Sequence, residues 1–249
     1  HLHGYLGKSC LCISHGSGTA SSVPVSASSA AESTVSSVEE TASSAVDENE
    51  AAAAQLLNDL TGSYQELWPV ILADEYKQTW LDDCTALVGE DNAEAAFEKL
   101  SSMVTGDVYG EDAVKAYANG GGAYFCGFTN SLATLTFDGE TSTISGTDKD
   151  GNVLFSHTYH YIGMEPVHGL YEFESDDADS GEFTYFFLAP DTSAETYHIE
   201  FRYGSDAETL SQYDAGEYAY WVASGISTDC DQTMIDNCIE LFCTENLAG

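Results

Sequence analysis

The sequence predicts an α+β fold in which helices precede and follow an antiparallel β-unit. Between about residues 55 and 105, apolar residues recur at helical spacing. After residue 120 they form short, partly alternating runs rich in aromatic and β-branched residues, separated by tight turns such as Asp138-Gly139 and Asp150-Gly151. Consecutive short strands of this kind favour a meander, closed as a barrel or open as a sandwich.

The helical patterns are bounded by glycines and by one proline. Gly89 and Gly106 are expected to stop two helices, and Pro69 is expected to end or kink another. The helices are expected at Gln55–Leu60 leading into Ser63–Leu72, Asp74–Leu87, Ala93–Val104, Asp206–Tyr213 and Gln232–Cys243. The strands are expected at Ala123–Phe128, Ala133–Phe137, Ser142–Ser145, Val153–Tyr161, Leu170–Glu174, Phe183–Leu188 and Tyr197–Tyr203.

Composition divides the chain into three parts. Residues 17–50 hold eleven Ser and no aromatic, Leu, Ile or basic residue, so this stretch cannot bury enough apolar surface to offset its ordering entropy. We therefore expect a leader remnant over residues 1–16, a disordered Ser/Ala/Glu-rich linker over 17–51 and one folded domain over 52–249. The chain opens on His1, which is typical of a fragment or a processed product.

The charge of the chain excludes several partners. There are 42 acidic side chains against 6 Lys and Arg, for a formal net charge of −36. Nucleic-acid binding and attraction to an anionic membrane both need clustered Lys and Arg, so neither is expected. No run of about 18 apolar residues predicts a membrane span. Of the acids, 35 fall after residue 62, so the charge belongs to the folded domain.

The sequence carries no motif of nucleophilic, dinucleotide or P-loop chemistry, and we do not expect an enzyme. Thr147–Asn152 faintly resembles a calcium loop, but Gly146 stands where the first ligand belongs, so a hairpin turn is favoured. The seven cysteines contain no CxxC pair. An exported protein could form bridges among Cys230, Cys238 and Cys243, and buried free thiols are an equal alternative.

Histidines are the most informative residues for function. Four of the seven lie in the β-unit, at positions 157, 160, 168 and 198. In an antiparallel meander the end of one strand lies beside the start of the next. His160, His168 and His198 are therefore expected to gather at one end of the β-unit, where neutral imidazoles can bind zinc. His157 has the opposite strand parity to His160 and is the weaker candidate.

The domain resembles the ZinT (YodA) family of bacterial zinc-binding proteins, which also occurs at the C-terminus of some zinc-transporter solute-binding proteins. The resemblance covers roughly residues 60–245 and rests on an ordered set of segments rather than on one motif. These segments are Gly62–Leu72, Asn152–Tyr161, Gly169–Glu174, Ala189-Pro190, Thr196–Gly204 and Glu217–Trp221. It implies a calycin (lipocalin-like) antiparallel barrel with flanking helices, export from the cytoplasm, and zinc scavenging or delivery to a zinc ABC importer.

The resemblance also implies a metal site, onto which this sequence fits in part. The family uses one His before its Ala-Pro and two in a His-aromatic-His pair. His198 matches the last of these, whereas Thr196 and Phe186 or its neighbour stand at the other two positions. His168 and His160 are then expected to substitute, with Glu200, Glu165 or water completing four ligands.

A second interpretation is a metal-free, lipocalin-like barrel that binds a small ligand or a surface partner. Its cavity would be lined by aromatic residues that suit an ordinary core equally well: Tyr185, Phe186, Phe187, Tyr197, Phe201 and Tyr203. In the leader, His1, His3, Cys10, Cys12 and His15 could hold metal, and a Cys before a Ser/Ala-rich linker also suits a lipid-anchored protein.

Overall fold

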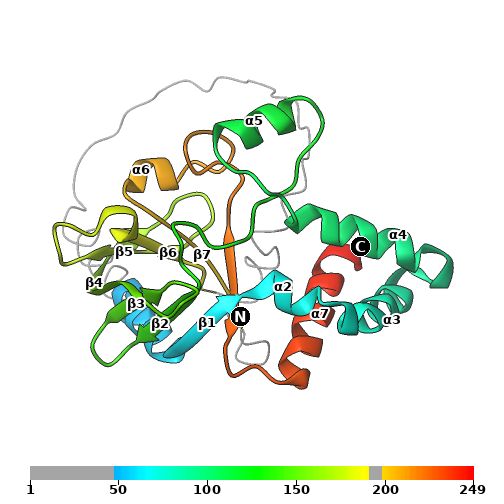
Figure 1. Ribbon diagram of the computed structural model, residues 1–249, viewed down its shortest axis with the longest axis horizontal. Coiled ribbons are helices and arrows are strands. Elements are labelled where there is room, and N and C mark those ends of the chain that lie inside the picture. The colour runs from blue at the N-terminus through cyan, green and yellow to red at the C-terminus, as the bar shows by residue number, and fades with distance from the viewer. Residues whose placement is uncertain (1–47, 191–197) are drawn as a thin grey trace, which may run out of the picture.

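The protein is a closed barrel of eight antiparallel strands with a group of helices beside it (Figure 1). The computed structural model describes residues 48–190 and 198–249. Each strand pairs with the next in sequence, and the last pairs with the first. The α+β class and the antiparallel barrel expected from the sequence are therefore confirmed, and the sandwich alternative is wrong.

The barrel strands are β1 (Gly62–Glu66), β2 (Thr134–Asp138), β3 (Thr143–Thr147), β4 (Val153–Met164), β5 (Tyr171–Ser175), β6 (Tyr185–Leu188), β7 (His198–Gly204) and β8 (Ala223–Ser227). The helices are residues 48–59, α2 (Leu67–Ile71), α3 (Lys77–Val88), α4 (Glu90–Val104), α5 (Glu111–Ala118), α6 (Ala207–Leu210) and α7 (Gln232–Leu247). Single turns of 3-10 helix lie at Asp74–Tyr76 and Gly181–Phe183.

The two strands that close the barrel were not predicted. β1 falls where a helix was expected at Ser63–Leu72, and β8 falls in a segment with no strand assignment. β1 is a strand because Tyr64 turns inward beside Leu135, while Ser63 bonds the Thr136 hydroxyl at 2.8 Å on the outside. The strand expected at 123–128 is instead an irregular segment that makes isolated bridges through Phe125.

Pro69 lies inside a helix rather than at its end. It is the third residue of α2, in the first turn, where a backbone N–H has no partner within the helix. The expectation that Pro69 ends or kinks a helix is therefore wrong, and a short helix starts just before it. Gly89 does end α3, with φ of 87°, a conformation that glycine adopts without strain.

Aromatic rings fill the barrel interior along its β4–β6–β7 side. Phe186, Phe201 and Tyr203 are fully buried, with ring centroids 5.3–6.4 Å apart. Phe155 of β4, two strands away in the barrel, stacks on Phe186 with ring centroids 5.8 Å apart. This region is a packed core, so the aromatic residues of β6 and β7 do not line an open calyx there.

Helices α3, α4 and α7 lie together to one side of the barrel, joined to it by α2 (Figure 1). Their shared core is aromatic: the Trp80 indole N–H donates to the Ile71 carbonyl at 2.7 Å, and Phe242 packs 4.7 Å from Trp68. Because these rings tie α2, α3 and α7 to one another, α7 is held opposite the outer face of β7.

Arg202, the single arginine of the chain, is fully buried on the outer face of β7. Its guanidinium donates to the carbonyls of Leu210, Tyr218 and Trp221 and stacks 4.3 Å over the Tyr213 ring. These bonds fasten the segment between β7 and β8 onto the barrel, so Arg202 has a structural role.

The domain boundaries stay predictions, because the leader and most of the linker lie outside the described residues. Residues 48–51, at the end of the expected linker, are helical. Within the described residues, no helix is both long and apolar enough to cross a bilayer.

We predict that Arg202→Lys destabilises the fold by about 2–4 kcal/mol, because an ammonium group cannot reach three separate carbonyls and leaves some of them buried without a donor. Urea unfolding followed by circular dichroism measures this change. Lys115→Met, at an exposed ion pair with Asp112, is the control and should stay within about 0.5 kcal/mol of wild type. An equally small effect of Arg202→Lys would contradict the assigned role.

Candidate metal site

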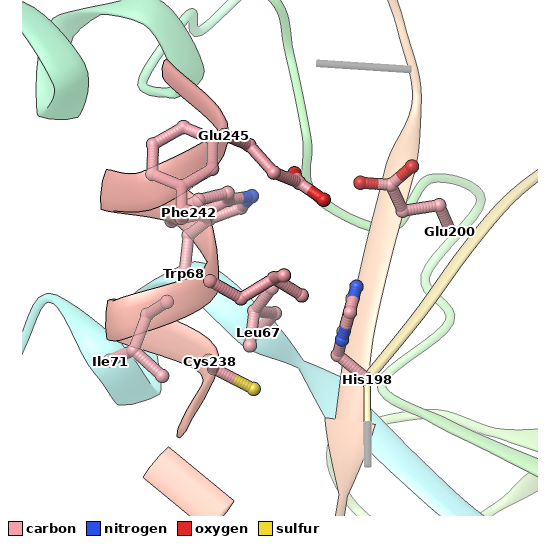
Figure 2. Close-up of a pocket in the computed structure, with 9 residues that line it drawn as sticks. Leu67, Trp68, Ile71, His198, Glu200, Cys238, Phe242 and Glu245 are labelled. Carbon is pink, nitrogen blue, oxygen red and sulfur yellow. The ribbon is translucent and has the colours of Figure 1, made fainter. Parts of the chain in front are cut away.

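The outer face of β7 presents His198 and Glu200 to the helices. Alternation along the strand turns Ile199, Phe201 and Tyr203 into the barrel, so the even-numbered residues point out. α2 and α7 cover this outer face instead of solvent (Figure 2). The two side chains that share a strand face are thus brought together against α7.

A small cavity lies between β7 and α7, and we call it the β7–α7 pocket. Its volume is about 20 Å³, which is room for one water molecule or an ion. Figure 2 shows the carboxylates of Glu200 and Glu245 facing each other across it, with the His198 ring beside them. The lining residues are Leu67, Trp68, Ile71, His198, Glu200, Cys238, Leu241, Phe242 and Glu245.

Burial sets the charge state of the groups in this pocket. It lowers the pKa of His198 from 6.5 to about 4, so the imidazole is neutral at pH 7. It raises the pKa of the Cys238 thiol to about 12. Glu200 is only 4% exposed. A neutral imidazole beside carboxylates is the ligand chemistry that a divalent metal ion uses, whereas the protonated thiol is not.

Two buried donors near these groups lack hydrogen-bond partners. The Trp68 indole nitrogen makes no hydrogen bond, and Figure 2 shows it turned toward the space between α7 and β7. The Ser224 hydroxyl, on β8 directly opposite Glu200, also has none. Buried polar groups are nearly always satisfied, and the Trp68 nitrogen is the one of these two donors whose side chain lines the β7–α7 pocket, where a water molecule could accept from it.

His160 lies at the other end of the barrel from His198. His160 pairs with Glu174 on β5, Glu174 pairs with Tyr185 on β6, and Tyr185 pairs with Gly204 on β7. Gly204 is six residues from His198, which is about 20 Å along β7 at the rise of a strand. The expectation that His160 lies near His198 is wrong, because it placed His160 at the end of its strand. β4 continues to Met164, so His160 lies inside the strand. Its ring instead pairs with Asp176, 2.6 Å from Nδ1.

His168 belongs to a third environment. Its ring packs 4.1 Å from Tyr213, and Nδ1 is buried without a hydrogen bond, 3.9 Å from a Glu165 oxygen. Burial is the main cause that lowers the pKa of His168, and the positive charge of Arg202 lowers it further. The negative charge of Glu165 acts in the opposite direction and raises it. Arg202 is four residues from His198, about 13 Å along β7.

The Glu165 carboxylate accepts the backbone N–H groups of Val167 and His168, at 2.7 and 2.6 Å. It therefore shapes the β4–β5 loop. His157, which the sequence rated the weaker candidate, bonds Asp177 at 2.6 Å.

Of the four expected ligands, the structure brings together His198 and Glu200. Phe186 points into the barrel, on the opposite sheet face from His198, and Thr196 lies outside the described residues. In residues 48–190 and 198–249, no group of three or more His, Cys, Asp and Glu side chains is close enough to hold a metal ion. The expected cluster of three histidines is therefore not present in that part of the chain.

Sequence reasoning missed two residues of the pocket, Trp68 and Glu245. Cys238, Phe242 and Glu245 are spaced i, i+4 and i+7, so a helical-face projection of α7 could have placed Glu245 beside Cys238. Nothing in the local sequence relates Trp68 to His198, because their proximity results from barrel closure.

No protein-family model and no curated protein matches this chain. Among solved structures, the chain is similar to the Zn(II)-bound ZinT-like domain of Streptococcus pneumoniae AdcA, with 17% identity and a TM-score of 0.47, covering 74% of this chain and 89% of that one. It is also similar to Zn(II)-bound AdcA of the same organism, with 15% identity and a TM-score of 0.43, covering 74% of this chain and 34% of that one.

We predict that His198 makes the fold less stable at mildly acidic pH. The unfolded imidazole takes up a proton as the pH falls below 6.5, whereas the folded one stays neutral down to about pH 4. Stability is therefore lost as the pH falls, by about 2 kcal/mol between pH 7 and pH 5. Urea unfolding in EDTA at both pH values should show a loss in wild type that is about 2 kcal/mol smaller in His198→Gln.

Ile226→Val is the matched control, because Ile226 lies opposite His198 on β8 and does not titrate. It should lower stability equally at both pH values and keep the wild-type difference between them. An unchanged pH difference in His198→Gln would contradict the buried, neutral imidazole.

Proposed function

We propose that this domain binds a divalent metal ion, with zinc the preferred ion, in the β7–α7 pocket. The protein ligands are the His198 imidazole and the carboxylates of Glu200 and Glu245. The observation that carries the proposal is a neutral buried imidazole beside two carboxylates at a cavity of about 20 Å³. The resemblance of the sequence to the ZinT family favours the same ion.

Three protein ligands leave a fourth tetrahedral position for water, as zinc commonly has. The Trp68 N–H at the pocket wall and the Ser224 hydroxyl opposite Glu200 on β8 are donors without a partner, and donors of this kind orient the ligands around a metal. The carboxylate oxygens that do not contact the ion would be the acceptors for these donors.

The three ligands are not close enough together in the described structure to hold an ion, so binding requires α7 and β7 to close on it. His198 and Glu200 are fixed by a barrel strand, whereas Glu245 is half-buried, two residues before the end of the last helix. We infer that Glu245 makes the larger movement. Binding then joins α7 to the barrel and raises the stability of the fold.

The physiological role that fits this site is extracytoplasmic zinc scavenging, or delivery to a zinc importer. The acidic surface, with a formal net charge of −36 for the chain, concentrates cations near the domain without selecting among them. Selectivity would come from the imidazole and the geometry of the pocket.

We predict that His198→Ala weakens zinc binding by at least about 100-fold, because changes to outer-shell partners alone cost 10–100-fold. Glu200→Gln should weaken it in the same direction. Calorimetric titration of the full chain measures the affinity. Cys10 and Cys12 are replaced by Ser in every variant, so that the leader thiols do not contribute.

His160→Ala is the matched control, since His160 lies about 20 Å away along the barrel, and its affinity should equal that of wild type. Two results would contradict the proposal: no zinc uptake by wild type at micromolar concentration, or a loss in His160→Ala as large as in His198→Ala.

We predict that Trp68→Phe weakens zinc binding by about 10-fold, because it removes the indole donor and keeps an aromatic ring. Trp80→Phe is the control, since the Trp80 N–H already bonds the Ile71 carbonyl. Trp80→Phe should lower thermal stability and keep the wild-type affinity. Equal affinities in the two variants would remove Trp68 from the site.

A further inference from the structure

Two cysteine sulfurs meet in the core of the helical group. Cys84 of α3 and Cys243 of α7 have their Sγ atoms 4.0 Å apart, although 159 residues separate them along the chain. Both side chains are fully buried. All five cysteines of the described residues are thiols in the structure, so of the two alternatives from the sequence it has the free thiols and not bridges among Cys230, Cys238 and Cys243.

The two cysteines lie on helices that are held together independently of their sulfurs. α3 packs along α7, and Trp80 of α3 meets Phe242, the neighbour of Cys243, with ring centroids 6.0 Å apart. A disulfide has an S–S distance of about 2.05 Å, so the sulfurs must approach by about 2 Å. Side-chain rotation and a small shift of the helices can supply that movement.

We propose that Cys84 and Cys243 form a structural disulfide when the chain folds in an oxidising environment. The two thiols lose two protons and two electrons as the S–S bond forms. A low-molecular-weight disulfide such as oxidised glutathione takes them up, and its own S–S bond breaks to give two thiols. This proposal does not depend on the metal site.

The bond forms during folding and not in the finished protein. The thiolate is the species that attacks a disulfide, and burial raises the pKa of both thiols. No oxidant can reach the pair once α3 and α7 have docked, because both residues are 0% exposed. Until then the sulfurs are accessible and can exchange.

The cross-link has a large effect on the unfolded chain because it closes a long loop. The segment between the two cysteines contains the whole barrel except β1, so the bond restricts most of the domain in its unfolded state. It also fastens α7, the wall of the β7–α7 pocket that carries Glu245, to α3. A single bond thereby fixes the last helix to the first half of the domain.

Refolding of the full chain with reduced and oxidised glutathione tests the proposal. Free thiols are then alkylated, and the protein is digested with pepsin at acidic pH, where disulfides do not exchange. Mass spectrometry should find one peptide pair joined through Cys84 and Cys243. Protein refolded in reductant should melt roughly 5–15 °C below the protein refolded with the glutathione mixture.

The double variant Cys84→Ala/Cys243→Ala should melt at the same temperature after either refolding, while Cys230→Ala should keep the wild-type difference. Three results would overturn the proposal: both thiols alkylated after oxidative refolding, either cysteine joined to a different partner, or equal melting temperatures for the protein refolded with glutathione and the protein refolded in reductant.

Discussion

Closure of the barrel by β8 is the constraint on which the rest of the structure depends. β8 pairs with β7 on one side and with β1 on the other, and β1 leads directly into α2. This close approach needs small residues: a Cβ on Gly225 would lie 3.0 Å from the Ile199 side chain. The closure places Trp68, from the start of the domain, beside His198 from its second half, and α7 follows β8 to cover both.

The β7–α7 pocket differs from the surface around it in its electrostatics. Exposed carboxylates give the domain its charge and attract any cation, whereas burial holds the His198 imidazole neutral and keeps Glu200 away from solvent. A neutral imidazole lowers stability in mild acid, yet neutrality is the state in which it can bind a metal. The same burial thus weakens the fold and prepares the site. Cys243 lies on α7, the helix that lines the pocket, and Cys84 lies on α3 next to it. A bond between them would add stability to this part of the domain.

The sequence predicted the fold class and most strands, because alternation and turn residues are local signals. It failed where tertiary contacts decide: β1 is too short for its period to be distinguished from a helix, and β8 reads Ala-Ser-Gly-Ile-Ser, a pattern set by close packing. For the site, same-face parity correctly joined His198 to Glu200. The grouping with His160 was wrong because it depended on the end of β4, and strand ends are the least predictable feature of a pattern. Glu245 lies on α7, and no local sequence pattern predicts that α7 packs over β7.

Crystals of the zinc-loaded protein, measured on both sides of the zinc absorption edge, test the central claim most directly. We predict an anomalous difference peak between β7 and α7, with the His198 imidazole and the carboxylates of Glu200 and Glu245 within about 2.0–2.2 Å of it. A peak beside His160 and Asp176, a site built from cysteine sulfurs, or no peak between β7 and α7 would contradict the account.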